Sequence, residues 1–204
     1  EVTVCAADLE VHVDVFADGG GATAAAGRLA EALRARFAED VYADDERSVA
    51  EIVLELCRER GLTLATAESC TGGLVGARLT AVPGASDVYV GGVVAYSNDV
   101  KSAHLRVPED VLASHGAVSA EAAEAMAAGA RAAFEADAAI AVTGIAGPGG
   151  GTEEKPVGLV FLHAQSPHGA AAERLHLPGD REAVRARATV AALHLFRRLL
   201  TQSV

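Results

Sequence analysis

Leu64-Ala-Thr-Ala-Glu-Ser-Cys-Thr-Gly-Gly73 runs directly into Leu74-Val-Gly-Ala-Arg-Leu79. The first part is a β-prone apolar run that ends in polar residues, and the second has the apolar spacing of a helix. We therefore expect a strand, a tight turn at the two glycines and a helix that begins after them. Small residues let a ligand approach the backbone closely, and a helix start favours an anion. The turn is predicted to form the floor of an active site.

Strand and helix patterns alternate on both sides of this turn. Helical apolar spacing occurs in the segments 48–60, 119–135 and 181–201. Apolar or alternating runs predict strands at 88–96, 138–142, 157–164 and 172–177, the last two as an antiparallel pair. Such alternation predicts an α/β (α+β) fold, a layered mixed β-sheet flanked by helices.

The first 43 residues predict a separate small strand-helix module. Alternating residues at 2–5 and 9–16 favour two strands, and the segment 23–39 has the spacing of an amphipathic helix. A polar junction follows, so we place a domain boundary between 1–43 and 44–204. A module of this size buries little surface alone, and we expect it to pack against the larger domain or an upstream one. The abrupt strand-like start predicts a fragment of a longer protein.

Composition narrows the classes of function. The chain has 204 residues, half of them hydrophobic, and a formal charge of -11. An acidic surface argues against nucleic acid as the main partner. The cysteines, Cys5, Cys57 and Cys70, form no C-x-x-C pair, which favours a reducing cytoplasm over a disulfide framework. No apolar run approaches the roughly 20 residues that span a bilayer, so we expect no membrane association. The spacing of the seven histidines predicts no metal site.

The turn 68–73 has two interpretations. Glu68, Ser69, Thr71 and Gly72 could cradle a phosphate or orient a carbonyl substrate, or they could simply cap a helix. The full strand-turn-helix context favours a functional role. Cys70 could be a nucleophile activated at the helix start, but a small half-buried thiol is the better interpretation.

Ser86, Tyr96 and Lys101 flank the apolar strand predicted at 88–96. A serine nucleophile needs a neighbouring base, and a lysine with a pKa lowered by burial can serve. Tyr96 could relay a proton or hold the lysine in place. The alternative is a loop serine, a core tyrosine and a surface lysine, because the sequence does not place the two ends of the strand together.

A glycine-rich loop and an arginine complete the set of candidates. The segment 143–152, which contains Thr143 and Gly144, follows a predicted strand and lacks the Gly-Lys-Ser/Thr of a P-loop. We interpret it as a shaped wall of the pocket, since ligands of α/β folds bind at strand ends. Arg181 begins the last helix, where a cation opposes the dipole. It could clamp a phosphate or carboxylate, or pair with Asp180 or Glu182 on the surface.

Together these segments resemble the C-terminal domain of the competence/damage-inducible CinA family. The resemblance covers roughly residues 46–202, and the first 43 residues resemble the KH-like linker module of full-length members. The matching motifs are T-A-E-S-C-T-G-G at 66–73, V-P-G-A-S at 82–86, G-G-V-V-A-Y-S-N-D-V-K at 91–101, G-A-V-S at 116–119, V-T-G-I-A-G-P-G-G-G at 142–151, K-P-V-G at 155–158 and P-G-D-R at 178–181.

The resemblance implies a nicotinamide mononucleotide deamidase, an amidohydrolase of pyridine-nucleotide (NAD) recycling without a cofactor. It implies Ser86 as nucleophile, with Ser69 as the next candidate, Lys101 as base and Tyr96 assisting. Ser69, Thr143 and Arg181 match other site positions that would bind substrate or the oxyanion. Val88 and Tyr89 replace aromatic residues after Ser86, which alters how a pyridinium ring would stack.

A second hypothesis is a non-catalytic binding or assembly module in competence or DNA-damage responses. The KH-like segment favours it, while Gly19-Gly-Gly-Ala without flanking basic residues and the acidic charge oppose nucleic-acid binding. For either function we expect the upstream domain of full-length members as a partner. The apolar helix stripes leave room for a homodimer.

Overall fold

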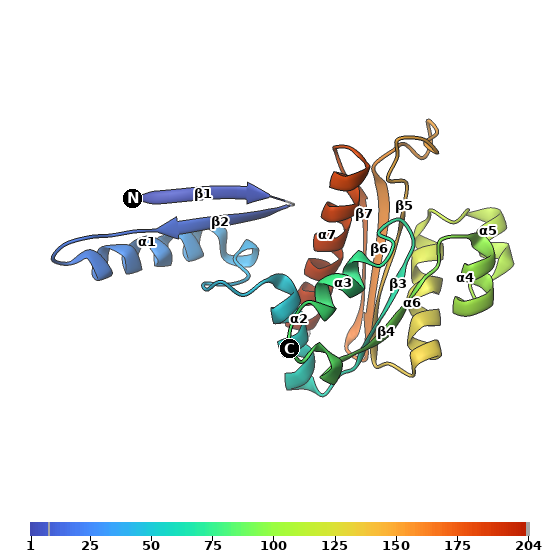
Figure 1. Ribbon diagram of the computed structural model, residues 1–204, viewed down its shortest axis with the longest axis horizontal. Coiled ribbons are helices and arrows are strands. Elements are labelled where there is room, and N and C mark those ends of the chain that lie inside the picture. Colours follow the sequence, from blue (N-terminus) through green and yellow to red (C-terminus); the bar gives the residue numbers. More distant parts are fainter. Residues whose placement is uncertain (8, 203–204) are drawn as a thin grey trace. The chain divides into compact units, whose positions relative to one another are not determined.

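The computed structural model describes residues 1–7 and 9–202, and the chain divides into two compact units, Glu1–Ser48 (unit 1) and Val49–Val204 (unit 2) (Figure 1). The unit boundary falls a few residues beyond the predicted one. We describe each unit by itself. In the part of the chain described, no helix is long and apolar enough to cross a membrane.

Unit 1 consists of a two-stranded antiparallel ribbon and a helix. Strands β1 (Val2–Ala7) and β2 (Glu10–Val15) pair so that Val2 lies opposite Val15 and Val4 opposite Val13. Alternation along each strand places these valines on one face of the ribbon. Helix α1 (Ala22–Phe37) follows, and then a short 3-10 helix, η1 (Ala38–Asp40). The predicted strands and helix are confirmed, and the KH-like character stays a prediction.

Unit 2 is built on a five-stranded mixed sheet in the order β4-β3-β5-β6-β7. Strand β3 lies parallel to β4 and to β5, whereas β6 pairs antiparallel with both β5 and β7. The predicted mixed sheet is therefore confirmed. The strands are β3 (Leu64–Glu68), β4 (Tyr89–Val94), β5 (Ala138–Gly144), β6 (Leu159–Ser166) and β7 (Gly169–His176).

Helices cover both faces of this sheet, as Figure 1 shows. The alanines of β3 and β5 that point to one face, such as Ala65 and Ala139, form a buried cluster with Met126 and Ala130 of α6. The other face is covered by α7, which packs against α2 and α3. The helices are α2 (Val49–Arg60), α3 (Leu74–Thr80), α4 (Asn98–Leu105), α5 (Glu109–Ser114), α6 (Ala120–Phe134) and α7 (Arg181–Gln202).

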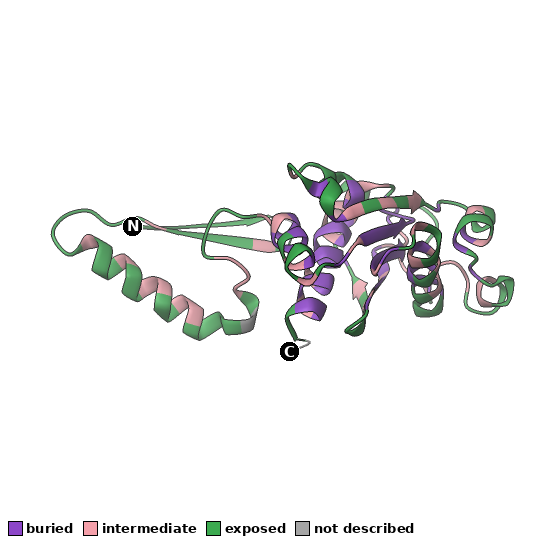
Figure 2. Cartoon of the chain, turned by 90° about the horizontal axis from the view of Figure 1, so that it is seen from below, coloured by how far each residue is buried: buried purple, intermediate pink, exposed green. Residues whose placement is uncertain are grey.

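The parallel strands bring three chain segments to one edge of the sheet. Glu68, the last residue of β3, lies opposite Val94 of β4 and Val142 of β5. The residues that follow these positions therefore emerge side by side at the carboxyl edge, where open α/β sheets bind ligands. The deeply buried strands are β3, β5 and β6, and much of α7 is buried as well, whereas β4 and β7 are partly exposed (Figure 2). Glu68, Ser69 and Thr143, which lie at this edge, are buried too.

Candidate functional site

The buried pair at the carboxyl edge is Lys101 and Ser69. Helix α4 is N-capped by Ser97, whose hydroxyl accepts a hydrogen bond from the Val100 N–H. Lys101 lies about one turn after the start of this helix, on its buried face. Lys101 is 1 % exposed and Ser69 is 9 % exposed. The Lys101 Nζ lies 3.0 Å from the Ser69 Oγ and donates to the Ala95 carbonyl oxygen at 2.6 Å. A hydroxyl and an amine are thus held within hydrogen-bond distance and away from water.

Burial changes the chemistry of this lysine. Loss of water around the amine lowers the pKa of Lys101 from its ordinary value, with nearby Cys70 opposing the change weakly. No carboxylate forms an ion pair with Lys101 among the described residues. The lowered pKa makes the uncharged amine easier to form than it is in water, and the lone pair of that form can accept a proton from Ser69.

Cys70 is an unreactive neighbour of this pair. The side chain is buried, and the desolvation of its thiol raises the pKa of Cys70 to about 11. A nucleophilic cysteine needs a lowered pKa. Cys70 is therefore a small packed thiol, buried more deeply than the half-buried one that the sequence predicted.

Glu68 occupies the place that was predicted for a substrate anion. Its carboxylate accepts hydrogen bonds from the backbone N–H groups of Gly73, Val75 and Gly76 at 2.9–3.1 Å. These are the free donors at the start of α3, which the carboxylate satisfies and whose dipole it neutralises. Glu68 is 2 % exposed. The expectation that Glu68 binds substrate is thus corrected: Glu68 caps the helix and holds the turn.

Three further predicted binding residues face the protein rather than a pocket. Thr143 is fully buried and its Oγ1 donates to the Ala117 carbonyl at 2.6 Å. Thr71 is fully buried, with an Oγ1 that has no hydrogen-bond partner in the described part of the chain. A side chain at Gly144 would meet the Leu159 carbonyl oxygen at 2.7 Å, so the glycine permits close strand packing. Gly72 stays exposed in the turn, with φ +63°.

The structure does not bring Ser86 and Lys101 together. Ser86 lies in the 3-10 helix η2 (Ala85–Asp87), before β4, and is exposed to solvent. The Leu64 N–H donates to the Val88 carbonyl, so this segment lies at the amino edge of the sheet. Strands rise about 3.3 Å per residue, which separates the two edges by roughly 15 Å. Ser69, the second candidate, takes the position beside Lys101, and the expectation for Ser86 is corrected.

Tyr96 and Arg181 meet next to the buried pair. The Arg181 guanidinium donates to the Tyr96 hydroxyl at 2.7 Å and to the Gly147 carbonyl at 2.8 Å. Tyr96 follows Ala95, the acceptor for Lys101, and is 60 % exposed. Arg181 thereby ties the end of β4 to the glycine-rich loop after β5. The contact with Gly147 links this loop to Arg181, and its role as a wall of the pocket stays a prediction. Arg181 does not pair with Asp180 or Glu182.

Arg185 is a residue that the sequence analysis missed. Its Nε donates to the Cys70 carbonyl at 3.2 Å and its Nη2 to the Thr71 carbonyl at 2.9 Å. A methyl group added at Gly72 would lie 3.3 Å from the same guanidinium. Arg185 follows Arg181 by four positions, so both lie on one face of α7. That spacing is the signal that could have found it.

A groove lies between the start of α3 and the start of α7. It has a volume of about 400 Å³ and is lined by Leu74, Arg181, Glu182, Arg185 and Ala186. Arg181 contacts Tyr96 and Arg185 contacts the turn after Ser69, so hydrogen bonds link two residues of the groove to the segments that carry the Lys101–Ser69 pair.

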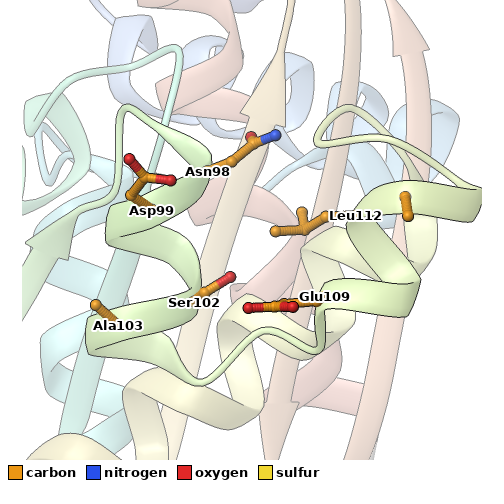
Figure 3. A pocket seen from close by; sticks show the side chains of 7 residues that line it. Asn98, Asp99, Ser102, Ala103, Glu109 and Leu112 are labelled. Atoms are coloured by element: carbon orange, nitrogen blue, oxygen red, sulfur yellow. The ribbon is translucent and has the colours of Figure 1, made fainter.

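A larger hollow of about 620 Å³ lies elsewhere, between α4 and α5. Asn98, Asp99 and Ser102 of α4 line it together with Glu109 and Leu112 of α5, and Figure 3 shows Ser102 pointing toward Glu109. Neither Lys101 nor Ser69 lines either hollow. We place the candidate site at the groove by α7 because two of its lining residues, Arg181 and Arg185, contact Tyr96 and the turn after Ser69. Across residues 1–7 and 9–202, no cluster of three or more His, Cys, Asp or Glu side chains could hold a metal ion.

A family model and the related proteins found by comparison all point to the same family. A family model described as the CinA C-terminal domain matches residues 46–200. The CinA-like protein of Mycolicibacterium paratuberculosis is 48 % identical over 208 residues, which cover 100 % of this chain and 47 % of that protein. The CinA-like protein of Parasynechococcus marenigrum is 51 % identical over 200 residues, 95 % of this chain and 48 % of its own. The chain spans about half the length of these curated relatives.

Solved structures agree in fold. The competence/damage inducible protein CihA from Agrobacterium tumefaciens matches with a TM-score of 0.69 and 41 % identity, over 71 % of this chain and 89 % of that chain. The competence-damaged protein (CinA) superfamily protein from Enterobacter cloacae matches with a TM-score of 0.70 and 34 % identity, over 80 % of this chain and 97 % of that chain. The chain therefore belongs to the CinA family.

Proposed function

We propose that unit 2 is a nicotinamide mononucleotide deamidase, which hydrolyses the carboxamide of the nucleotide to nicotinic acid mononucleotide and ammonia. The observation that carries the proposal is the buried Lys101 amine, 3.0 Å from the Ser69 hydroxyl and lacking a carboxylate partner in the described part of the chain. A serine beside a desolvated lysine is a nucleophile-base pair suited to amides. The family resemblance supplies the choice of amide.

In the proposed first step, neutral Lys101 accepts the proton of Ser69 while the Ser69 Oγ attacks the amide carbon. The Lys101 Nζ donates to the Ala95 carbonyl and to the Ser69 Oγ, and loss of one proton from the amine would let its lone pair accept the proton of that hydroxyl. The resulting ammonium stays hydrogen-bonded to Ala95 and beside the new oxyanion. A charge that forms in a dry site needs donors already in place.

Tyr96 is suited to provide such a donor. The Tyr96 hydroxyl accepts its hydrogen bond from Arg181, which leaves the phenolic proton available for donation. Collapse of the tetrahedral intermediate breaks the C–N bond, and the Lys101 ammonium returns the proton so that ammonia leaves. Water activated by the neutral amine then cleaves the Ser69 ester, which releases the acid and restores the serine.

The test is ammonia release from nicotinamide mononucleotide, with the nucleotide product identified by mass spectrometry. The proposal expects stoichiometric ammonia and nicotinic acid mononucleotide. Release of free nicotinamide instead would indicate cleavage of the glycosidic bond and contradict it. No product at all, together with a shift of single-stranded RNA or DNA in a gel, would favour the binding-module hypothesis.

A further inference from the structure

The groove between the start of α3 and the start of α7 carries two arginines on its α7 side. Arg181 and Arg185 are separated by four positions and both line the groove, with Leu74 of α3 opposite them. Arg185 is half-buried, and Arg181 is more open to solvent. Two guanidinium groups on one wall form a strongly positive surface on a chain with a net charge of -11.

Neither arginine is neutralised by a carboxylate within the described residues. Arg181 donates to the Tyr96 hydroxyl and the Gly147 carbonyl, and Arg185 donates to the Cys70 and Thr71 carbonyls. These uncharged acceptors fix both side chains but leave their charges in place. Glu182 also borders the groove, and its side chain is exposed to solvent, which screens its charge.

The fixed positions of the two arginines relate the groove to the reactive pair. Arg185 holds the two carbonyls that follow Ser69, and Arg181 holds the side chain that follows the Ala95 acceptor of Lys101. A ligand whose anionic end lies between the arginines would therefore extend toward Ser69. The apolar side chain of Leu74 offers a surface for an uncharged part of that ligand.

We propose that this groove binds the phosphate monoester of the substrate, with Arg181 and Arg185 as its ligands and Leu74 against the sugar. Guanidinium groups match phosphate oxygens with paired hydrogen bonds. The choice of a sugar phosphate rests on the proposed function, since a nucleotide amide carries its phosphate at a distance from the reacting carbon. Arg181 and Arg185 would then select the nucleotide over the nucleoside.

Binding without chemistry tests the groove directly. Calorimetric titration of the full chain with ribose 5-phosphate should give saturable binding, whereas ribose should give none. Arg181→Gln and Arg185→Gln should each weaken binding by roughly 10- to 100-fold, the range for a hydrogen bond to a charged group. Arg187→Gln is the matched control on the same helix: Arg187 donates to the Pro178 carbonyl and does not line the groove. Equal binding by all variants would overturn the proposal.

Kinetics separate phosphate binding from a purely structural role of Arg185 in the turn. The ratio of kcat/KM for nicotinamide mononucleotide to that for nicotinamide riboside should fall at least about 10-fold in both arginine variants. If Arg185 only holds the turn, both substrates would lose activity equally, and an unchanged ratio would overturn the proposal. Arg181→Gln keeps the turn contacts intact and serves if Arg185→Gln folds poorly.

The failure of this inference differs from the failure of the proposed reaction. Arginine-dependent binding of ribose 5-phosphate without any ammonia release would contradict the proposed deamidase reaction and support the phosphate site. Ammonia release at equal rates from nucleotide and nucleoside would support the deamidase reaction and contradict the phosphate site.

Discussion

Ser69 and Ser86 lie at opposite edges of the same sheet, one after β3 and the other before β4. Ser69 is enclosed and lies 3.0 Å from a desolvated amine, whereas Ser86 is exposed on a short 3-10 helix. Both serines lie in short turns that also contain glycine, Gly72 and Gly73 after Ser69 and Gly84 before Ser86. This difference shows that the local motif does not determine which serine lies beside the lysine. The position at the carboxyl edge of the parallel strands does.

The carboxylates at the two edges differ in the same way. Glu68 is buried and accepts three backbone N–H groups of the turn and of α3. Asp137 precedes β5 at the amino edge and accepts from the backbone and hydroxyl of Thr63, while remaining partly open to water. The carboxyl edge is thus the one where polar groups are held rigidly inside the core.

The largest effect is expected from the two serines. Ser69→Ala should lower kcat for ammonia release by at least about 10³-fold, since the nucleophile is lost. Ser86→Ala, the matched control, should keep activity within about twofold because its hydroxyl is exposed at the far edge. Steady-state assays at saturating nicotinamide mononucleotide make the comparison. The reverse ranking would return the nucleophile to Ser86.

The next largest loss of activity is expected from substitutions of Lys101. Lys101→Met keeps the length of the side chain without a base, and kcat should fall roughly 10²- to 10⁴-fold. Lys101→Arg keeps the charge but cannot become neutral, so it should be equally inactive. Recovery of activity in the arginine variant would mean that the charge, and not a lone pair, is what Lys101 supplies. Circular dichroism verifies that each variant is folded.

The pH profile should reflect the buried amine. Burial lowers the pKa of Lys101 below its ordinary value of 10.5, and only the neutral amine accepts the Ser69 proton. Activity should therefore rise with pH and level off once the pH exceeds this lowered pKa, with the inflection below 10.5. Measurements of kcat/KM from pH 6 to 10 in the wild type test this. A profile that falls with rising pH across the whole range would mean that the reactive form is protonated.

The smallest effects concern stability. Glu68→Ala leaves three N–H groups at the start of α3 without their acceptor and should lower the free energy of unfolding by about 2–4 kcal/mol. Asp137→Ala removes a more exposed acceptor and should cost about 1 kcal/mol. Urea unfolding followed by circular dichroism measures both. Equal losses would show that the two edges do not differ in rigidity.

Much of the fold followed from the sequence because strand, turn and helix patterns are local. The turn 69–73 was predicted at the segment where it occurs. For Lys101 the sequence left open whether the side chain is a buried base or lies on the surface, and the structure buries it. The choice between the two serines was not local. It depends on β3 and β4 being parallel, which places the residue after β3 beside the segment after β4. Periodicity predicted both strands without their relative direction.

The sequence did not predict the roles of Glu68 and Arg185, because both depend on contacts between segments. A carboxylate after a strand looks the same in sequence whether it faces a ligand or the next helix start. Arg185 reaches the turn from 114 positions away along the chain, through the packing of α7 against α3. Only the four-residue spacing from Arg181 marked it.

The proposed reaction requires a covalent intermediate on Ser69, whose hydroxyl lies beside the Lys101 amine. The most direct test mixes the enzyme with excess nicotinamide mononucleotide, stops the reaction in acid and maps acylated peptides by mass spectrometry. We expect an ester of the nucleotide acid on Ser69, absent in Ser69→Ala and still present in Ser86→Ala. An ester found on Ser86, with Ser69 unmodified, would contradict it.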